Sequence, residues 1–238
     1  MDISSIIKKL IVSDKNIEML FETKGRVYSF INPYGYHLLR KNKELYDSLD
    51  GLFVDGIFMC LLTRFYFGVK VKRRSFDMTS LAKDCFERLA RSGESIYFVG
   101  ASEEEISATI SLLKEDYPLI NIVGYRNGFF ESEDERISCF ETIVKNNPDF
   151  VIVGMGAVLQ EQFVVGLKKY GFKGIAFTCG GYIRQASTGL DYYPKWVDKC
   201  HLRAFYRLFH EKGMAKRLYN ILIEFPIVYL CDRIQTKL

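Results

Sequence analysis

The chain alternates between short apolar runs and longer stretches in which apolar residues recur every three or four positions. The short runs are rich in β-branched and aromatic residues, which predicts buried strands, whereas the longer periodicity predicts helices. Strands are expected at residues 26–31, 52–54, 95–99, 119–123, 150–153 and 174–178. Helices are expected at residues 34–49, 57–67, 79–91, 103–117, 133–145 and 159–170.

This alternation favours an α/β fold that is Rossmann-like, with a mostly parallel sheet and helices on both of its faces. Sheets of this kind bind ligands beyond the carboxyl ends of their strands. Residues that directly follow a predicted strand should therefore gather on one rim of the sheet, although they are far apart in the chain. These residues are Asn32, Asp55, Gly100, Gly154, Gly156 and Gly180.

The stretch from residue 150 to 161 combines a buried strand, a glycine turn and the start of a helix. This arrangement can aim backbone N–H groups at an anion, with the helix dipole behind them. Gly154 and Gly156 would let the chain turn tightly and let a ligand approach the backbone. An ordinary turn between a strand and a helix accounts for the same pattern without any ligand, and for a glycine pair alone it is the more frequent explanation.

Composition indicates a globular protein, because 48% of the residues are hydrophobic and 26% are charged. The net charge of +4 is too mild and too dispersed to indicate a nucleic-acid-binding protein. The six cysteines show no CxxC spacing, so we expect reduced core residues and neither a zinc site nor a redox motif. No apolar run approaches the roughly 18 residues needed to span a bilayer, and the N-terminus lacks a signal-peptide pattern. A soluble or peripheral protein is expected.

Residues 192–238 differ from the rest, which suggests a Rossmann-like domain at 1–191 and a helical C-terminal appendage at 192–238. In this tail, aromatic and basic residues interleave at helical spacing, as they do on surfaces that meet acidic lipid headgroups. A C-terminal helix whose apolar face docks on the sheet domain would show the same pattern, and one helix could do both. The apolar run at 221–230 is interrupted by Glu224 and Pro226, so shallow insertion is the most it could achieve.

Asp55 follows a predicted strand and precedes an apolar helix. A carboxylate in this position could act as a general base. It could equally be the N-cap of the helix, which the local sequence alone favours.

Eight motifs occur in order along most of the chain, and together they resemble the WecG/TagA/CpsF family of bacterial glycosyltransferases, glycosyltransferase family 26. The resemblance covers about residues 30–220. The motifs are Asn32-Pro33, Asp55-Gly56, Arg74-Ser75-Phe76-Asp77, Asn127-Gly128-Phe129-Phe130, Gly154-Met155-Gly156-Ala157 with Gln160-Glu161, Cys179-Gly180-Gly181, Pro194-Lys195-Trp196 and Phe205-Tyr206-Arg207-Leu208.

The resemblance implies inverting transfer of a sugar from a nucleotide-sugar donor, usually UDP-linked, to a polyprenyl-diphosphate-linked sugar acceptor. Such enzymes build bacterial surface polysaccharides, including capsule, exopolysaccharide and teichoic acid. They work without a metal or another cofactor, and this sequence has no Asp-x-Asp motif. A cytoplasmic protein bound peripherally to the inner leaflet of the cytoplasmic membrane is implied, with self-association into a homo-oligomer left open.

Carried over residue by residue, the resemblance makes Asp55 the catalytic base and Asn32 its neighbour that orients a sugar. It makes Arg74 the contact to a diphosphate, and a guanidinium suits bidentate phosphate binding, although a solvated basic connector would look the same. Gln160 would bond sugar hydroxyls or phosphate, unless it is only a first-turn surface residue. Gly154, Gly156, Gly180 and Gly181 would shape the nucleotide cleft. Arg207, and with less support from the motifs Arg217, would lie in a tail that closes over the site.

The sequence departs from the family pattern in three places. Phe30 stands where a threonine is common, and the adjacent Ser29 should point to the other face of its strand. The segment after Arg74 is shortened, which leaves its loop geometry uncertain. The usual Ala-Pro-Lys before the glutamine is replaced at 157–159, so one lysine that could meet phosphate is missing, which leaves the identity of the donor open.

Two other functions remain open at this stage. The first is a dinucleotide-binding oxidoreductase, because the sheet pattern is shared, but no strand is followed by a full GxGxxG motif. The second is a non-catalytic relative that serves as a binding subunit, against which Asp55, Arg74 and Gln160 are all present.

Overall fold

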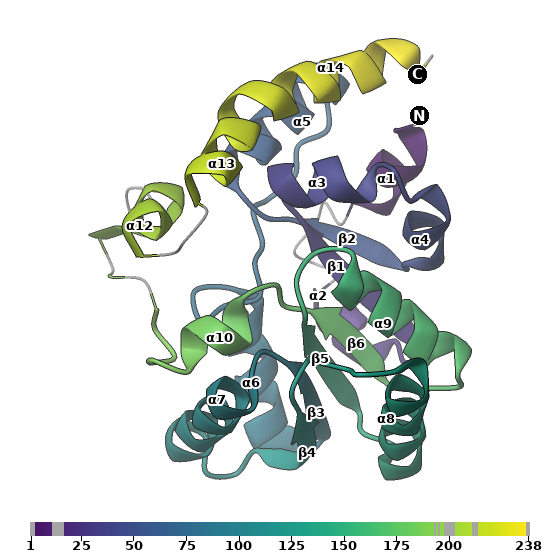
Figure 1. Ribbon diagram of the computed structural model, residues 1–238, viewed down its shortest axis with the longest axis vertical. Helices are drawn as coiled ribbons and strands as arrows, with labels where there is room; N and C mark the ends of the chain where they lie inside the picture. The colour runs from purple at the N-terminus through teal and green to yellow at the C-terminus, as the bar shows by residue number, and fades with distance from the viewer. Residues whose placement is uncertain are drawn as a thin grey trace.

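A six-stranded sheet forms the centre of the molecule, and all its strands run parallel in the order β2-β1-β6-β5-β3-β4 (Figure 1). The computed structural model describes residues 3–10, 17–192, 194, 196–197, 203–210 and 214–236. The strands are β1 (Arg26–Ile31), β2 (Gly51–Val54), β3 (Ser95–Gly100), β4 (Asn121–Arg126), β5 (Phe150–Gly154) and β6 (Ile175–Thr178). The α/β prediction is therefore confirmed, and within the described residues the sheet is wholly parallel.

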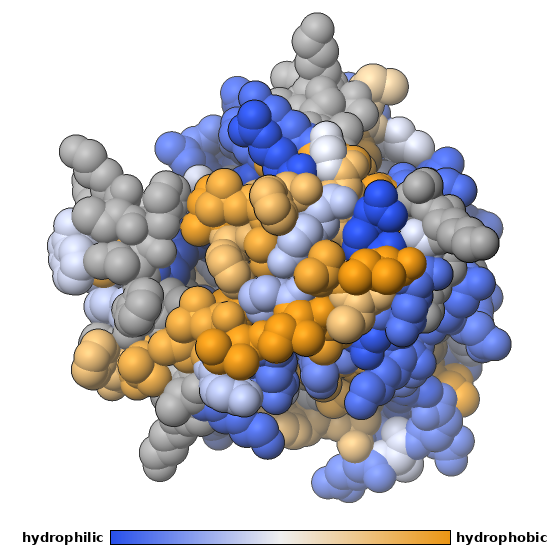
Figure 2. Space-filling model, turned by 90° about the horizontal axis from the view of Figure 1, so that it is seen from above, coloured by the Kyte–Doolittle hydropathy of each residue, from blue (hydrophilic) through white to orange (hydrophobic). Residues whose placement is uncertain are grey.

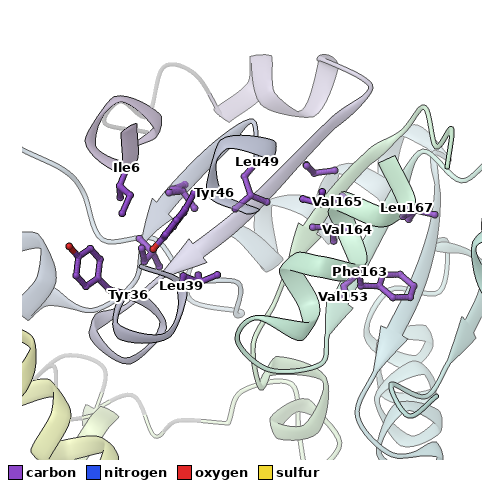
Figure 3. Close-up of a cluster of buried hydrophobic side chains, with 14 of the residues drawn as sticks. Ile6, Tyr36, Leu39, Tyr46, Leu49, Val153, Phe163, Val164, Val165 and Leu167 are labelled. Atoms are coloured by element: carbon purple, nitrogen blue, oxygen red, sulfur yellow. The ribbon is translucent and has the colours of Figure 1, made fainter. Parts of the chain in front are cut away.

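Helices cover both faces of the sheet. On one face α1 (Ser4–Lys9), α3 (Pro33–Leu39), α4 (Lys43–Ser48), α8 (Glu133–Asn146) and α9 (Leu159–Lys169) share a core that includes Val27 and Val153. Figure 3 shows side chains from α3, α4 and α9 meeting in this core. On the other face α2 (Ile17–Glu22), α6 (Leu81–Ser92), α7 (Glu103–Asp116) and α10 (Tyr182–Ala186) pack on a core that includes Phe53 and Ile152.

Burial along the strands explains the sequence pattern. Every residue of β2, β5 and β6 is buried, which produces continuous apolar runs typical of parallel strands that are covered on both faces. The edge strand β4 alternates between exposed and partly buried residues. β4 begins two residues later than predicted and extends to Arg126. The residues just before it form a turn, in which the Ile120 N–H donates to the Tyr117 carbonyl.

Most helix boundaries agree with the prediction, and one helix does not. The stretch 34–49 forms two helices, α3 and α4, because Asn42 has a non-helical backbone between them. Ser102 and Glu105 form the expected reciprocal capping box on α7. Ser132 caps α8 as expected, but its partner Glu135 accepts from the N–H of Glu131 in place of Ser132, so the second box is incomplete.

The tail is helical and packs above the carboxyl edge of the sheet (Figure 1). It contains α12 (Arg203–His210), α13 (Met214–Tyr219), a π-helical turn η2 (Asn220–Glu224) and α14 (Phe225–Gln235). The π turn ends two residues before Pro226, whose missing N–H and bulky ring disturb regular α-helical bonding. Helix α14 lies against α3 and against α5 (Ile57–Phe67), whose N-termini both lie at this edge.

The interface between tail and sheet domain contains a buried ion pair. Asp232 on α14 accepts hydrogen bonds from the Tyr36 hydroxyl, at 2.6 Å, and from the Arg40 guanidinium, with Nε at 2.8 Å. Burial alone would raise the pKa of Asp232, but the bonds from Arg40 and Tyr36 outweigh burial and lower it. The Tyr229 hydroxyl lies 2.9 Å from that of Thr63 on α5.

The cysteines largely follow expectation. Cys60, Cys85, Cys139 and Cys179 are free thiols in the cores. Cys231 is free but exposed on α14, so the prediction of a core residue was wrong there, because this position lies on the outer face of the helix. Cys200 lies outside the described residues.

Candidate active site at the carboxyl edge of the sheet

The ends of β1 and β2 bring Asn32 and Asp55 together. The backbone N–H of Asp55 donates to the carbonyl of Ile31 at 2.8 Å, so the two strand ends are directly bonded. Asn32 is the N-cap of α3, and its side-chain oxygen accepts from the Gly35 N–H at 2.8 Å. The two residues that sequence analysis paired are therefore neighbours on one rim.

Asp55 is not the N-cap of α5, so the interpretation that the local sequence favoured was wrong. The N-cap is Gly56, whose φ of +100° is a conformation that glycine adopts without strain. That turn leaves the Asp55 carboxylate beside the helix end, with 34% of its side chain exposed to solvent. The group is thus accessible to a ligand and stands on a rigid strand end.

Arg73 is the basic residue that faces Asp55. Its guanidinium lies 3.4 Å from Asp55 Oδ1. The segment around it runs extended beside β2, with a bridge between Val54 and Arg73 and a bond from the Arg74 N–H to the Val54 carbonyl. Successive residues of an extended segment point to opposite sides, so Arg74 turns away and pairs with Asp84 on α6 at 3.8 Å.

Sequence analysis assigned the diphosphate contact to Arg74, and that role stays a prediction. The residue that it missed is Arg73, whose guanidinium lies near Asp55. The family motif identified one arginine of an adjacent pair, and alternation along an extended segment could have pointed to the other as a second candidate.

Asp77 continues this line of charges toward the tail. It lies 3.8 Å from the Arg73 guanidinium and 2.5 Å from that of Arg203 on α12. Burial would raise the pKa of Asp77, but the Arg203 charge and hydrogen bonds from Ser75 and Thr79 outweigh burial and lower it. We call the alternating series Asp55–Arg73–Asp77–Arg203 the charge chain; it joins the end of β2 to the C-terminal tail.

The four predicted site glycines have different roles. A Cβ on Gly154 would lie 2.8 Å from the Cys179 sulfur, so this glycine permits close packing of β5 against the turn after β6. Gly156 and Gly180 have φ values of +81° and +59° and face open space. Gly181 has only ordinary contacts around it. Gly156 and Gly180 therefore have the most open space beside their backbone.

Gln160 is buried, and both polar atoms of its amide have partners in the protein. Its oxygen accepts from the Gly180 N–H at 3.0 Å, and its nitrogen donates to Glu161 Oε1 at 2.9 Å. The surface alternative for Gln160 was wrong, because the first turn of α9 directs its side chain inward to the turn after β6. In this arrangement Gln160 fixes the turn that carries Gly180.

Glu161 is a residue that sequence reasoning quoted but did not assign. It is fully buried and accepts hydrogen bonds from the Ser29 hydroxyl at 2.7 Å, from Gln160, and from the Val158 N–H at 2.7 Å. Burial raises its pKa against the effect of these donors. The Val158 backbone has φ +75°, which is strained for a β-branched residue, so Glu161 holds an unfavourable turn in place.

Phe30 and Ser29 lie on opposite faces of β1, as expected. Phe30 stacks on Phe53 with ring centroids 4.9 Å apart. Ser29 points into the other core, where its hydroxyl also lies 2.9 Å from that of Thr178. The Ser29 hydroxyl therefore does not reach the face of the sheet that Phe30 occupies.

The tail supplies one further basic residue near α3. The Arg217 guanidinium lies 5.1 Å from the centre of the Tyr34 ring, two residues beyond Asn32. Arg207 belongs to α12, but its side chain lies outside the described residues. In the described part of the chain, none of the helices combines the length and the apolar character that crossing a bilayer requires.

Comparison with known proteins identifies the family of this chain. A family described as the Glycosyl transferase WecG/TagA/CpsF family matches residues 9–238. A Shigella boydii protein named UDP-Gal:alpha-D-GlcNAc-diphosphoundecaprenol beta-1,4-galactosyltransferase is 30% identical over 223 residues, which are 93% of this chain and 92% of that protein. A Bacillus subtilis (strain 168) protein named N-acetylglucosaminyldiphosphoundecaprenol N-acetyl-beta-D-mannosaminyltransferase is 26% identical over 204 residues, 83% of this chain and 76% of its own.

A third relative, from Staphylococcus aureus (strain MW2), has the same name as the Bacillus protein and is 24% identical over 141 residues, 59% of this chain and 54% of its own. The family match spans almost the whole chain, including the strand ends that hold Asn32 and Asp55. This chain is therefore a member of the WecG/TagA/CpsF family of glycosyltransferases.

Proposed function

We propose that this protein transfers a sugar, with inversion, from a UDP-linked donor to a sugar on a polyprenyl diphosphate during synthesis of a bacterial surface polysaccharide. The observation that carries the proposal is the cluster of Asn32, Asp55 and Arg73 at adjoining strand ends of a chain in this family. The names of the relatives support the chemistry of the substrates: each contains diphosphoundecaprenol, and one contains UDP-Gal.

The carboxylate of Asp55 is the general base of the proposed reaction. It takes the proton from the acceptor hydroxyl while that oxygen forms a bond to the anomeric carbon of the donor. The bond from this carbon to the UDP oxygen breaks on the opposite side, and its electron pair leaves with UDP. A single displacement of this kind inverts the anomeric configuration. Asn32, next to Asp55, orients one of the two sugars.

The donor diphosphate needs positive charge and backbone donors around it. Arg73 stands beside Asp55 and offers a guanidinium whose fork suits two phosphate oxygens. Gly156 and Gly180 leave room for a phosphate or ribose to approach the turns after β5 and β6. Gln160 acts indirectly, because its amide oxygen accepts from the Gly180 N–H and so holds the turn that carries Gly180. Arg74 contributes through its pair with Asp84, which fixes the basic segment.

The acceptor's lipid requires the enzyme to work at a membrane surface. We infer peripheral association with the cytoplasmic membrane through the tail, whose helix α14 packs against α3 and α5, the helices that begin beside Asn32 and Asp55. The tail also closes toward the site, since Arg203 joins the charge chain and Arg217 lies over Tyr34.

Asp55→Asn tests the proposed base. The substitution keeps the shape of a side chain that is one-third exposed, so the fold should persist. Loss of a general base costs about a hundredfold to ten-thousandfold in rate. The measurement is transfer from UDP-sugars to a short-chain polyprenyl-diphosphate sugar, followed by chromatography of the product.

Asp116→Asn is the matched control, because Asp116 is an exposed carboxylate at the far end of α7. It should transfer sugar at the wild-type rate. If Asp55→Asn retained more than a tenth of the activity, the proposed base would be wrong. A wild-type protein that bound the acceptor but transferred none of the UDP-sugars would instead favour a binding subunit. Binding of NAD would favour the oxidoreductase.

A further inference from the structure

Helix α5 carries an exposed apolar stripe that begins two residues after the proposed base. Ile57, Leu61 and Phe65 occupy successive turns on one face, and Phe65 is 80% exposed. Residues spaced by four positions line up along a helix, so this α5 stripe is about 12 Å long. Its opposite face, with Met59 and Thr63, is buried.

A second exposed stripe lies on the neighbouring tail helix. Ile223, Ile227, Leu230 and Ile234 follow a helical period on the outer face of η2 and α14, and all four are at least 40% exposed. The inner face of α14 holds Phe225 and Tyr229 against α5, with the Tyr229 hydroxyl bonded to Thr63. Figure 2, which looks down on the top of the molecule, shows a band of hydrophobic residues with further hydrophobic residues next to the band.

The two stripes lie on neighbouring helices, α5 and α14, which pack against each other although they are more than 150 positions apart in the chain. Helix α14 is apolar on both its inner and its outer face. In helices of this kind the outer face is usually shielded from water as well. An exposed apolar surface of this extent marks an interaction site.

The charges around α5 identify the partner. No Asp or Glu occurs between Asp55 and Asp77, whereas Arg64, Lys70 and Lys72 are exposed along this stretch. A second copy of the chain, docked by the same face around a two-fold axis, would bring these positive charges together. An anionic membrane surface would instead attract them while the apolar stripes enter the acyl boundary.

We propose that α5, together with α14, is the membrane-binding surface, and that α5 holds Asp55 at the lipid–water boundary. The α5 stripe inserts into the bilayer at headgroup depth, and Arg64, Lys70 and Lys72 meet anionic lipid phosphates. Because α5 starts at Gly56, insertion places the Asp55 carboxylate where the sugar of a lipid-bound diphosphate emerges. This inference deepens the proposed function and rests on it for the acceptor, but membrane binding by α5 can be tested without catalysis.

The test is flotation of the full chain with vesicles of phosphatidylcholine and phosphatidylglycerol. Leu61→Gln with Phe65→Gln should lower the vesicle partition coefficient at least tenfold, because both apolar side chains leave the stripe. The matched control is Met19→Gln with Leu119→Gln, which removes two exposed apolar side chains from α2 and from the turn before β4. The control should float like the wild type, and thermal unfolding should be alike for all three proteins.

A second measurement links the surface to the reaction. The α5 variant should lose at least tenfold in kcat/KM toward a long-chain acceptor in vesicles, yet stay within twofold of wild type toward a short, water-soluble acceptor. Wild-type flotation by the α5 variant would overturn the proposal. So would a wild-type dimer that the α5 substitutions dissociate, since a second copy would then be the occupant. Failure of transfer to every soluble acceptor would refute the proposed function but leave the flotation result valid.

Discussion

At the scale of single residues, the site depends on side chains whose direction is decided by one alternation of the backbone. Arg73 faces Asp55 at 3.4 Å, and Arg74, one position later, pairs with Asp84. Phe30 and Ser29 separate in the same way on β1. A change of register by one residue would therefore exchange the arginine that lies near Asp55 for the one that pairs with Asp84.

Glu161 offers a prediction on pH at this scale. Its folded-state pKa is raised above the ordinary 4.5, first by burial, so the folded protein binds the proton more tightly than the unfolded chain. The contribution of Glu161 to stability should be largest below 4.5 and should fall as the pH rises through the folded pKa. Relative to Glu161→Gln, the wild type should thus lose stability as the pH rises above 4.5.

Urea unfolding of both proteins at several pH values measures this difference. Subtracting the two curves removes the contributions of all other titrating groups, because these are common to both. Parallel curves would mean that Glu161 keeps an ordinary pKa in the folded protein. Activity of the variant should also fall, since Glu161 helps to hold Gln160 and the Val158 turn.

At the scale of elements, the charge chain couples the tail helix α12 to the end of β2. Asp77 is shared between Arg73 and Arg203, and Arg73 is shared between Asp77 and Asp55. While Arg203 neutralises Asp77, Arg73 remains oriented toward Asp55 and the proposed diphosphate position. Without Arg203, electrostatic attraction should draw Arg73 toward Asp77.

Arg203→Gln should accordingly raise the KM for the UDP-sugar about fivefold while kcat changes less, since a partly buried ion pair contributes about 1 kcal/mol. Arg203→Lys should recover part of this loss, because it keeps the charge but lacks the planar fork. Arg91→Gln, on the exposed end of α6, is the control. Steady-state kinetics with varied donor decide the point, and an unchanged KM for Arg203→Gln would argue against the coupling.

At the scale of the whole molecule, α14 completes the core above the carboxyl edge of the sheet. Its Asp232, Tyr229 and Phe225 contact α3 and α5, the two helices that start beside Asn32 and Asp55. Deleting the tail would expose these apolar faces, so a truncated chain is a poor test of membrane binding. Surface substitutions that leave the inner face of α14 intact separate docking from membrane contact.

Asp232→Asn tests this anchor. It leaves the guanidinium of Arg40 without its buried carboxylate and should cost about 2–3 kcal/mol, less than for a fully buried pair because Arg40 is partly exposed. The pKa of Asp232 is lowered, so its stabilisation is present above its ordinary value of 3.8 and is lost as the pH falls through the folded pKa.

Denaturant unfolding at neutral pH measures the loss from Asp232→Asn, and hydrogen exchange should show faster opening of α14 and α3 than of β5. Asp116→Asn should unfold like the wild type. If exchange in α3 did not change, the tail would be only loosely attached and could not help to place Asn32.

Much of the fold could be predicted because local periodicity records burial. The apolar run of β5 and the period of α5 gave these elements their observed bounds to within a residue. Asp55 and Asn32 could be placed together since parallel strands bring their carboxyl ends to one edge. The break at Asn42 was missed, because its flanks continue the helical pattern and only the backbone shows the interruption.

By itself, the sequence determined the parallel sheet, the rim on which the polar residues gather and the family, because each depends on the type and order of residues along the chain. Only the tertiary structure decided which arginine lies near Asp55, that Gln160 is turned inward, and that α14 packs against α5. These features arise from contacts between segments far apart in the chain, and such contacts leave no periodic trace in either segment alone.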